Sequence, residues 1–501
     1  MCRDTQTRAI LLAHTLRAPM RATAREEKHL NLLEWMQYIR GKRCAVVGLG
    51  VSNLPLIGFL LMRGALVCAR DKKTRAELGE VADELEKQGA ILRLGEDYLE
   101  ELDEEIIFRS PGMRPDLPAF AAAVERGAVL TSEMELFLEL TPATVIGITG
   151  SDGKTTSTTL TGLILSQEYK NDEQTRIFVG GNIGKPLLPM VADMTEHDFA
   201  VVELSSFQLQ GATRSPHVTV ITNVTPNHLN WHKDMEEYTA AKTNGFRHAP
   251  CRRVVLNAEN RITAEMGKTA NIPVTYFSSK KESYTEFSLK AGDSAVYVRD
   301  GKIYLWNDGI EHEIMQAALL LLRGRHNLEN LMSAISLTFD YASADSVREV
   351  ATTFTGVKHR MEPVRVSNGV TYYDSSIDST PVRTAAVLSA MPAKPIVICG
   401  GSDKGTPYEP LADAICEYAK AVVLTGATAG KILTALSQKD EVQNGKIPVY
   451  LQADFSEAVK LACTTAQSGD IVLLSPACAS FDAFKDYKER GMTFRSIIEQ
   501  F

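Results

Sequence analysis

Short runs of apolar, mostly β-branched residues recur along the chain, and each is followed by a stretch with helical character. Such runs predict buried strands at 44–47, 144–148, 199–204, 218–222, 253–257, 396–399, 421–425 and 471–474. Strands that alternate with helices predict parallel sheets covered on both faces. In sheets of this kind ligands bind beyond the carboxyl ends of the strands. The pattern therefore predicts an α/β protein whose chemistry lies just after these runs.

The length and the seams of the chain predict its domains. At roughly 100–200 residues per domain, 501 residues suggest about three domains. Weak seams lie near Thr141-Pro142 and near Gly356. We therefore expect an N-terminal extension over 1–28, a first domain over 29–140, a central domain over 141–356 and a last domain over 357–501. Residues 278–313 alternate between polar and apolar, which predicts a hairpin insertion or meander.

Composition narrows the function classes. The formal net charge is -8 and the pI is near 5.8, which argues against broad nucleic-acid binding. The eight cysteines are scattered without a Cys-x-x-Cys pair, as expected for reduced thiols in the cytoplasm. No apolar run approaches the roughly 18 residues of a membrane span. Residues 1–28 are rich in arginine but lack a long apolar core; we interpret them as a mobile tail or an over-long start rather than a transit peptide.

A glycine-rich turn follows the predicted strand 144–148. Such a turn lets backbone N–H groups surround phosphate oxygens, and the next helix adds favourable partial charge. Lys154 supplies a cation to the terminal phosphates, and the Thr155 hydroxyl is placed for Mg²⁺. Five residues separate Gly147 from Gly153, where the standard Walker pattern has four. A glycine turn with a surface lysine is the alternative. The predicted ATP contacts here are Gly150, Ser151, Asp152, Gly153, Lys154, Thr155 and Thr156.

This turn, GSDGKTT from Gly150, resembles the signature of Mur ligases and folylpolyglutamate synthetases. Further segments resemble the D-glutamate-adding branch of the Mur ligase family in the same order. They are GGNIGKPL, ELSSFQL, TNVTPNHL, GRHNLEN, HRMEPV, GGSDKG and LSPACASFDAFKDYKERG. Together they span most of the chain after residue 40, and the last string is the most specific to this branch.

The resemblance implies a fold and an activity. The fold has a Rossmann-like UDP-binding domain, a central P-loop ATPase domain with a parallel sheet and a C-terminal Rossmann-like domain. The activity is an ATP-dependent ligation that adds D-glutamate to UDP-N-acetylmuramoyl-L-alanine through an acyl phosphate, giving ADP and phosphate. That reaction belongs to peptidoglycan biosynthesis, and so to cell wall biogenesis, cell shape and cell division. We expect no nucleic-acid partner, and we favour a monomer.

The expected catalytic residues follow strands. Glu203 ends an apolar run, and a carboxylate there is costly to bury unless it is paired or binds a metal such as Mg²⁺; an ion-paired or capping acid is the alternative. The resemblance makes His228 a ligand of a second Mg²⁺ and makes Lys242 a carbamate formed with CO₂. We interpret His232 as a surface residue. The implied catalytic set is Lys154, Glu203, His228 and Lys242, and the implied metal set is Thr155, Glu203, His228 and Lys242.

Further nucleotide contacts are also implied by the resemblance. Asn327 and Asn330 lie three apart on one face of a presumed helix and frame the adenine. Arg360 reaches the phosphates, although a junction arginine is also suited to an interdomain salt bridge. Asp374 contacts the ribose or the phosphates. Asn182 contacts a phosphate or the incoming carboxyl group.

The loop after the first strand carries Gly48-x-Gly50, and Asp71 follows about 20 residues later, as in a dinucleotide site. The third glycine is replaced by Asn53, so an NAD site is an open alternative. The resemblance instead makes this region the seat of the UDP substrate. The implied contacts are Gly50, Val51, Ser52, Asp71, Lys72, Ser110, Gly112 and Asn182.

The last domain carries the implied D-glutamate site, with Lys404 pairing a carboxylate, Ser480 donating a hydrogen bond and Tyr487 replacing a more familiar phenylalanine. The familiar Asp-Ser-Lys-Ala-Thr-Asn pattern is altered, because Ser376 replaces the lysine and Asp378 the threonine. An acid 4 Å from a substrate carboxylate would repel it by about 4 kcal/mol at an effective dielectric near 20. We expect Arg383 to offset that charge.

Three alternatives remain open at this stage. Another Mur ligase or a folylpolyglutamate synthetase would share the phosphate turn but not the C-terminal string. A nicotinamide-dependent oxidoreductase would use the first loop and leave the turn at Lys154 unexplained. A nucleotide-binding module without ligase turnover would fit the lost lysine at position 376.

Overall fold

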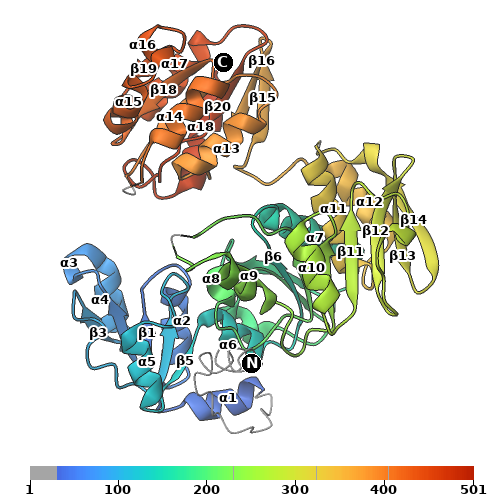
Figure 1. Cartoon of the computed structure of the whole chain (residues 1–501). Coiled ribbons are helices and arrows are strands. Elements are labelled where there is room, and N and C mark those ends of the chain that lie inside the picture. The colour runs from blue at the N-terminus through green and yellow to red at the C-terminus, as the bar shows by residue number, and fades with distance from the viewer. Residues whose placement is uncertain (1–30, 230, 323, 404–405) are drawn as a thin grey trace, which may run out of the picture. The chain divides into compact units, whose positions relative to one another are not determined.

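The computed structural model describes residues 31–501 except 230, 323 and 404–405 (Figure 1). The predictions for residues 1–28 and for Lys404 lie outside the described residues. Two compact units are formed. The first contains residues 31–151, 171–255 and 262–274, and the second contains 152–170, 256–261 and 275–501.

The first sheet has five parallel strands in the order β3-β2-β1-β4-β5. This is a doubly wound, Rossmann-like order in which the connections reverse direction between β1 and β4. Its strands are β1 (Arg43–Val47), β2 (Leu66–Asp71), β3 (Ile91–Leu94), β4 (Ile106–Arg109) and β5 (Val129–Thr131). Its helices are α1 (Leu32–Ile39), α2 (Asn53–Leu61), α3 (Arg75–Leu78), α4 (Glu80–Lys87), α5 (Pro118–Glu125) and α6 (Glu133–Leu140).

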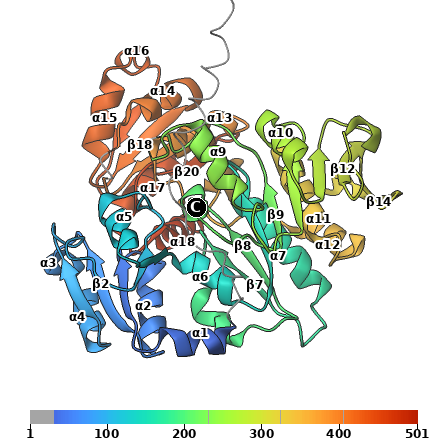
Figure 2. The ribbon, with the colours of Figure 1, turned by 60° about the horizontal axis from the view of Figure 1, so that its bottom comes forward.

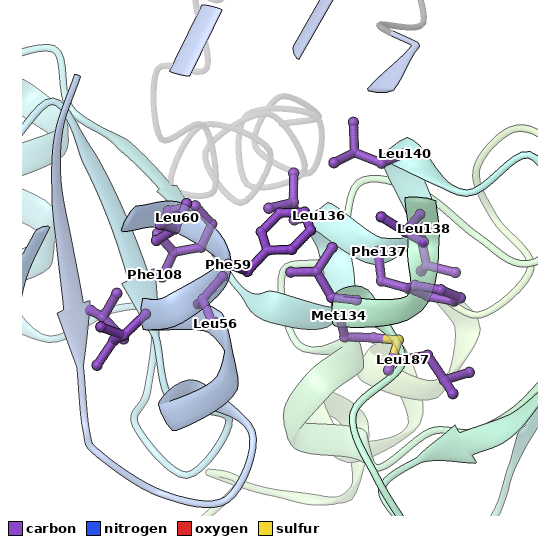
Figure 3. Packing of buried hydrophobic residues seen from close by; sticks show 14 of the residues in the cluster. Leu56, Phe59, Leu60, Phe108, Met134, Leu136, Phe137, Leu138, Leu140 and Leu187 are labelled. Carbon is purple, nitrogen blue, oxygen red and sulfur yellow. The ribbon is translucent and has the colours of Figure 1, made fainter. Parts of the chain in front are cut away.

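Alternation along β1 fills two cores. Cys44 and Val46 belong to one apolar cluster, and Ala45 and Val47 belong to another, because successive side chains of a strand face opposite sides. The larger cluster continues through α2 and α6 to Leu187 and residues beyond it (Figure 3). It therefore packs the first sheet and part of the central region into one compact unit.

The central sheet has nine strands in the order β14-β13-β12-β11-β10-β9-β6-β8-β7. The strands around the phosphate turn are parallel, and β7, β8 and β9 run through one sheet in Figure 2. The strands are β6 (Thr144–Thr149), β7 (Ile177–Gly181), β8 (Phe199–Glu203), β9 (Val218–Ile221), β10 (Arg253–Asn257) and β11 (Val274–Ser278), then β12 (Ser294–Arg299), β13 (Lys302–Asn307) and β14 (Ile310–Gln316). The last three are antiparallel neighbours, so the meander predicted within 278–313 is present.

The helices of the central region connect these strands. Within the first unit α8 and α9 lie side by side (Figure 1). Within the second unit α7 packs against α11 and α12. Their bounds are α7 (Lys154–Glu168), α8 (Ser206–Leu209), α9 (Met235–Thr243), α10 (Arg261–Thr269), α11 (Arg325–Thr338) and α12 (Ala344–Thr353), with short 3₁₀ turns η1 (Leu188–Asp193), η2 (Tyr284–Glu286) and η3 (Ala317–Leu319).

The C-terminal sheet has six strands in the order β15-β16-β20-β17-β18-β19, parallel except for the β15–β16 pair. Ile396 and Ile398 face a core with α17 and α18, whereas Val397 and Cys399 face one with α13 to α15. The strands are β15 (Glu362–Ser367), β16 (Val370–Asp374), β17 (Ile396–Gly400), β18 (Ala421–Thr425), β19 (Val449–Leu451) and β20 (Ile471–Leu474). The helices are α13 (Pro381–Ala390), α14 (Glu409–Tyr418), α15 (Ala429–Ser437), α16 (Asp440–Gln443), α17 (Phe455–Thr465) and α18 (Tyr487–Ile498).

All eight predicted strands are present, and the predicted α/β class with parallel sheets is confirmed. The three sheets fall within the ranges expected for the three domains, whose boundaries stay a prediction. Across the part of the chain that the structure describes, every helix is too short or too polar to cross a bilayer.

Candidate active site at the end of the central strands

The phosphate turn connects β6 to α7 in four residues. Gly150 has a φ of +146°, and a Cβ there would overlap the Thr222 hydroxyl. Gly153 has a φ of +80°, and a Cβ there would overlap the Asn330 amide oxygen. Only glycine fits either position without displacing a neighbour. Lys154 then starts a 15-residue helix with no acid in its first turn, an end whose N–H groups suit an anion.

Strand register brings several motifs to one edge of the sheet. Ile148 lies opposite Glu203, and Gly181 lies opposite the same glutamate from the other side. Thr149 lies opposite Ile221 on the next strand. The ends of β6, β7, β8 and β9 therefore meet where the phosphate turn begins. The Ser151 N–H donates to the Asn223 carbonyl at 2.9 Å, which holds the turn against the loop after β9.

Glu203 is buried at this edge, with 2% of its surface exposed. The Asn182 side-chain amide donates to its Oε1 at 2.9 Å, and the Asn182 N–H donates to its carbonyl at 2.8 Å. The structure thus brings Asn182, predicted at the UDP substrate, onto the glutamate predicted to bind metal.

The loop after β9 carries the two histidines. His228 is exposed, has a φ of +56° and lies 4.8 Å from the Phe207 ring. Non-glycine residues with such a φ are uncommon and gather at functional sites. His232, interpreted from the sequence as a surface residue, is instead 1% exposed. That interpretation was wrong because its ring packs against Phe207 and Tyr238 and forms a 2.9 Å hydrogen bond with the Ser206 hydroxyl.

Burial also sets the charge of His232. Loss of solvent lowers the pKa of its imidazole, and nearby Glu237 opposes that shift only in part. A buried imidazole with a lowered pKa is neutral at pH 7. It therefore acts in this structure as a packed hydrogen-bonding group.

Lys242 lies on α9 with 1% of its surface exposed. Its ammonium donates to the Gly150 carbonyl at 2.9 Å and to the Thr149 hydroxyl at 3.4 Å, and lies 4.6 Å from the centre of the Tyr238 ring. The Tyr238 hydroxyl is 3.0 Å from the Ser151 hydroxyl. Two residues one helical turn apart on α9 therefore support the start of the phosphate turn.

The predicted adenine residues lie on α11, as expected from their spacing. Asn327 and Asn330 are both buried. The Ser157 hydroxyl donates to the Asn330 amide oxygen at 3.4 Å, and the Ser333 hydroxyl donates to Ser157 at 2.9 Å. Asn330 thus lies beneath the first turn of α7, beside Gly153, where it takes part in the packing of the two helices.

The predicted UDP residues gather at the carboxyl ends of β1, β2 and β4. Gly48 packs so closely on Ser110 that a Cβ would lie 2.7 Å from the serine Cβ. The Asp71 carboxylate accepts the Leu49 N–H at 2.6 Å and the Lys73 N–H at 2.9 Å, so it fixes the loop backbone. The direction of the connections reverses between β1 and β4, where such sheets bind ligands. Exposed or partly exposed around this point are Gly50, Val51, Ser52, Lys72 and Gly112.

In the C-terminal sheet Asp374 is fully buried at the end of β16. His359 Nδ1 lies 2.8 Å from Asp374 Oδ2, and Arg495 Nε donates to the same oxygen at 3.2 Å. Burial would raise the pKa of the Asp374 carboxyl, but hydrogen bonds from His359 and from the Ser376 N–H hold it below its ordinary value. Arg360 is half-buried in the preceding segment. Asp374 is thus engaged within its own sheet.

The altered acid near the predicted D-glutamate site is also buried. Asp378 is 3% exposed and accepts a hydrogen bond from the Ser475 hydroxyl at 2.8 Å. Burial raises the pKa of its carboxyl, while hydrogen bonds from Ser375 and Ser475 and the charges of Arg383 and Arg360 act in the opposite direction. Hydroxyl donors and Arg383 therefore both stabilise the charged form of Asp378, whereas the sequence predicted this role for Arg383 alone.

The remaining predicted D-glutamate residues lie near one another in sequence. Ser480 is buried, and its carbonyl accepts the Phe484 N–H at 2.8 Å. Tyr487 begins α18, and its ring meets the His359 ring edge-on at 5.9 Å. Arg490 holds the same loop, donating to the Ala479 and Cys478 carbonyls at 3.0 Å.

Comparison with known proteins decides the family. The Mur ligase middle domain matches residues 148–338, and the Mur ligase glutamate ligase domain matches residues 359–478. Proteins named UDP-N-acetylmuramoylalanine--D-glutamate ligase are 44% identical to this chain over 468 residues in Clostridium novyi and in Clostridium perfringens. In both cases 93% of this chain and 98% of the relative are covered. The chain belongs to the Mur ligase family.

Solved Mur ligase structures share the fold. The UDP-N-acetylmuramate-alanine ligase of Thermotoga maritima matches with a TM-score of 0.51 and 19% identity over 92% of this chain and 99% of that one. A pseudomurein peptide ligase type C from Methanothermus fervidus matches with a TM-score of 0.50 and 19% identity over 92% and 100%. At such identities the likeness concerns the fold alone, and it confirms the predicted three-domain α/β class.

The donors at this Mur ligase site suit Mg²⁺, which takes one or two carboxylates together with hydroxyl, water and phosphate oxygens. Glu203 offers a buried carboxylate at the end of β8. Imidazole, as in His228, is a less usual ligand for this ion. Among the described residues no three His, Cys, Asp or Glu side chains gather into a preformed metal cluster.

Sequence reasoning missed residues that form hydrogen bonds to the loops and helices of this Mur ligase site. Tyr238 had a local signal, because it lies four residues before Lys242 and so on the same helix face. Arg114 and Glu237 had none, because they meet across 123 positions of sequence. Arg109 ends β4, is buried and donates to the Phe207 and Gln210 carbonyls. It was also missed, because these partners are distant in sequence.

Proposed function

We propose that this chain is the ATP-dependent ligase that adds D-glutamate to UDP-N-acetylmuramoyl-L-alanine during peptidoglycan synthesis. The observation that carries the proposal is the 44% identity along 93% of the chain to ligases of that name. The phosphate turn between β6 and α7 supports the ATP dependence, because backbone N–H groups and Lys154 suit a nucleoside triphosphate.

The reaction divides into two steps that share one carboxyl group. First, an oxygen of the alanyl carboxylate attacks the γ-phosphorus of ATP, the bond to the β-phosphate oxygen breaks, and ADP leaves. The acyl phosphate that forms is reactive enough for an amine to attack. Lys154 and the N–H groups that open α7 stabilise the charge that spreads over the transferred phosphoryl oxygens.

In the second step the uncharged amine of D-glutamate attacks the acyl carbon. The tetrahedral intermediate then expels phosphate, and an amide remains. The proton from the amine passes to solvent or phosphate. ATP therefore converts a carboxylate, which does not react with amines unaided, into an amide.

Glu203 and Thr155 are the residues we assign to Mg²⁺, with His228 toward a second ion. Bound Mg²⁺ supplies charge neutralisation on the phosphate oxygens. The carboxylate of Glu203 is buried at the end of β8 and accepts the Asn182 amide. Mg²⁺ prefers such carboxylate oxygens beside substrate phosphates.

Lys242 is the residue we assign to carbamylation by CO₂. Its amine is buried against the phosphate turn at Gly150, away from bulk solvent. Carbamylation requires the neutral amine, and desolvation favours that form of a lysine. The product is an anion, which suits a site that gathers Mg²⁺ and phosphates.

The other roles are assigned from the family likeness. The UDP substrate is assigned to the loops at the carboxyl ends of β1, β2 and β4, and D-glutamate to the region of Ser480, Tyr487, Arg383 and Lys404. ATP contacts are assigned to the phosphate turn, Asn327, Asn330, Arg360 and Asp374. We place the enzyme in the cytoplasm, because the seven cysteines of the described residues are free thiols, as in a reducing compartment.

A phosphate-release assay with purified protein, ATP, Mg²⁺ and UDP-N-acetylmuramoyl-L-alanine tests the function. Release should require D-glutamate and should be far slower with L-glutamate, L-lysine, diaminopimelate or L-alanine. Release with another amino acid would assign the chain to a different Mur activity, and no release with any of them would reject ligation.

A further inference from the structure

Arg114 joins the loop after β4 to helix α9. All five N–H donors of its guanidinium are used. Nε and Nη2 each donate to the Asp116 carboxylate. Nη1 and Nη2 each donate to the Glu237 carboxylate, and Nη1 also donates to the Trp231 carbonyl. All five distances are 2.7 to 3.0 Å. The side chains of Arg114 and Glu237 are 20% and 17% exposed. This pair is therefore a fixed bidentate contact rather than a mobile surface ion pair.

The same contact holds the turn that carries His228. The Trp231 and His232 N–H groups both donate to the His228 carbonyl, at 3.0 and 2.9 Å. The Trp231 indole donates to the Gly112 carbonyl at 2.8 Å. The turn at Gly112, assigned above to the UDP substrate, is thus attached directly to the segment of the proposed metal ligand.

Helix α9 extends the connection to the phosphate turn. Glu237 receives Arg114, the next residue Tyr238 meets the Ser151 hydroxyl at 3.0 Å, and Lys242 donates to the Gly150 carbonyl at 2.9 Å. Ser151 in turn donates to the Thr225 carbonyl at 3.0 Å. One rigid element therefore contacts the UDP-binding loop at its start and the ATP-binding turn at its end.

We propose that Arg114 is a positioning residue that couples binding of the UDP substrate to binding of ATP. Its contacts to Glu237 and to the Trp231 carbonyl carry this effect. The inference rests on the proposed function, because it takes the turn at Gly112 as the UDP-substrate site. Reciprocity follows from linkage: if the UDP substrate tightens ATP binding, ATP tightens UDP-substrate binding by the same factor.

The test measures the dissociation constant of a non-hydrolysable ATP analogue with Mg²⁺, with and without saturating UDP-N-acetylmuramoyl-L-alanine. In the wild-type enzyme the UDP substrate should tighten analogue binding by about tenfold, within the usual range of coupling between sites. In Arg114→Lys the ratio should fall to about one, because lysine cannot make the five-donor fork. Each ligand alone should bind the variant nearly as it binds the wild type.

Glu237→Gln provides a second variant, which nearly preserves the shape of the side chain while removing its charge. It should lose the same coupling, and the double variant should lose no more than either single one, because both changes remove one interaction. If Arg114→Lys does not fold, Glu237→Gln decides the question alone.

Arg214→Lys is the matched control. Arg214 pairs with Glu139 in the same unit at a similar exposure of 18%, and lies outside the connection through α9. It should keep the wild-type ratio. An unchanged ratio in Arg114→Lys, an equal loss in Arg214→Lys, or no coupling in a wild-type enzyme that ligates D-glutamate would overturn the inference. A wild-type enzyme that does not ligate would instead reject the proposed function.

Discussion

At the scale of single residues, the site contains two charged side chains that are deeply buried. Glu203 has 2% of its surface exposed and receives the amide of Asn182. Lys242 is as deeply buried and donates to the Gly150 carbonyl. Burying an ionised side chain is costly even when it is paired and hydrogen-bonded. Both positions therefore favour function over stability.

Glu203→Gln should lower kcat for ligation by at least about two orders of magnitude, the usual cost of losing a group that stabilises transition-state charge. The thermal unfolding midpoint should not fall, since the change removes a buried charge. Steady-state kinetics and calorimetry measure both, with exposed Glu196→Gln as the control. Near-normal turnover would show that this carboxylate has no role in the chemistry.

Lys242→Ala should be nearly inactive and should regain activity when short carboxylic acids are added, because they replace the anionic end of a carbamate. Rescue should be weaker with alkylamines, which replace only the ammonium. The assay is phosphate release at increasing acetate or propionate. Full activity of the variant without any additive would rule out the carbamate.

Arg383→Ala should raise KM for D-glutamate far more than KM for ATP. The reason is the buried acid Asp378, whose charge is balanced by Arg383 together with hydroxyl donors such as Ser475. Lys439→Ala, on a surface pair with Asp413 in the same sheet region, is the control. Small and equal changes in both KM values would remove Arg383 from the amino-acid site.

At the scale of elements, the strands could be predicted because a strand covered on both faces has to be apolar at nearly every position. Val145, Ile146 and Ile148 show this in β6. The polar residue that ends such a run lies at the sheet edge where ligands bind, which is why the sequence predicted a role for Glu203. His232 did not, because its burial depends on rings from α8 and α9 that no local pattern reveals.

Contacts between distant segments likewise could not be predicted from the sequence. The Arg114 fork joins the loop after β4 to the loop after β9 and to helix α9, and its charged members look like solvated surface charges in isolation. Asp71 illustrates the converse, since its spacing suggests a ribose ligand while its carboxylate fixes the backbone of Leu49 and Lys73. The Gly48-x-Gly50 motif and its spacing to Asp71 predicted where the site lies but not the role of every residue in it.

Helix α6 provides a pH-dependent stability prediction. Burial raises the pKa of Glu133 to about 7, with only partial compensation from the Leu188 N–H. The folded chain therefore holds this proton more tightly than the unfolded chain. Its contribution to the free energy of unfolding falls as pH rises from about 4.5 to about 7 and then stays constant.

Glu133→Gln should remove that loss. The variant should match the wild type near pH 4.5 and exceed its unfolding free energy by about 3 kcal/mol at pH 8, as expected for a shift of this size. Urea unfolding at the two pH values measures the difference, with exposed Glu125→Gln as the control. A difference that does not change with pH would contradict the assignment of the buried charge.

At the scale of the whole molecule, three sheets provide three sets of strand ends, and the proposed reaction has three substrates. The first sheet has a reversal point suited to a nucleotide, the central sheet has the phosphate turn, and the C-terminal sheet has the altered acid pattern around Asp378. The chemistry itself is assigned to the central sheet, where the alanyl carboxylate captures a phosphoryl group beside Lys154.

The transfer of oxygen from the alanyl carboxylate to phosphate tests that claim most directly. UDP-N-acetylmuramoyl-L-alanine labelled with ¹⁸O in this carboxylate is incubated with the enzyme, ATP, Mg²⁺ and D-glutamate, and the released phosphate is analysed by mass spectrometry. Each phosphate formed with the amide should carry one ¹⁸O atom, and Lys154→Ala should release almost none. Amide formation with unlabelled phosphate would contradict that claim.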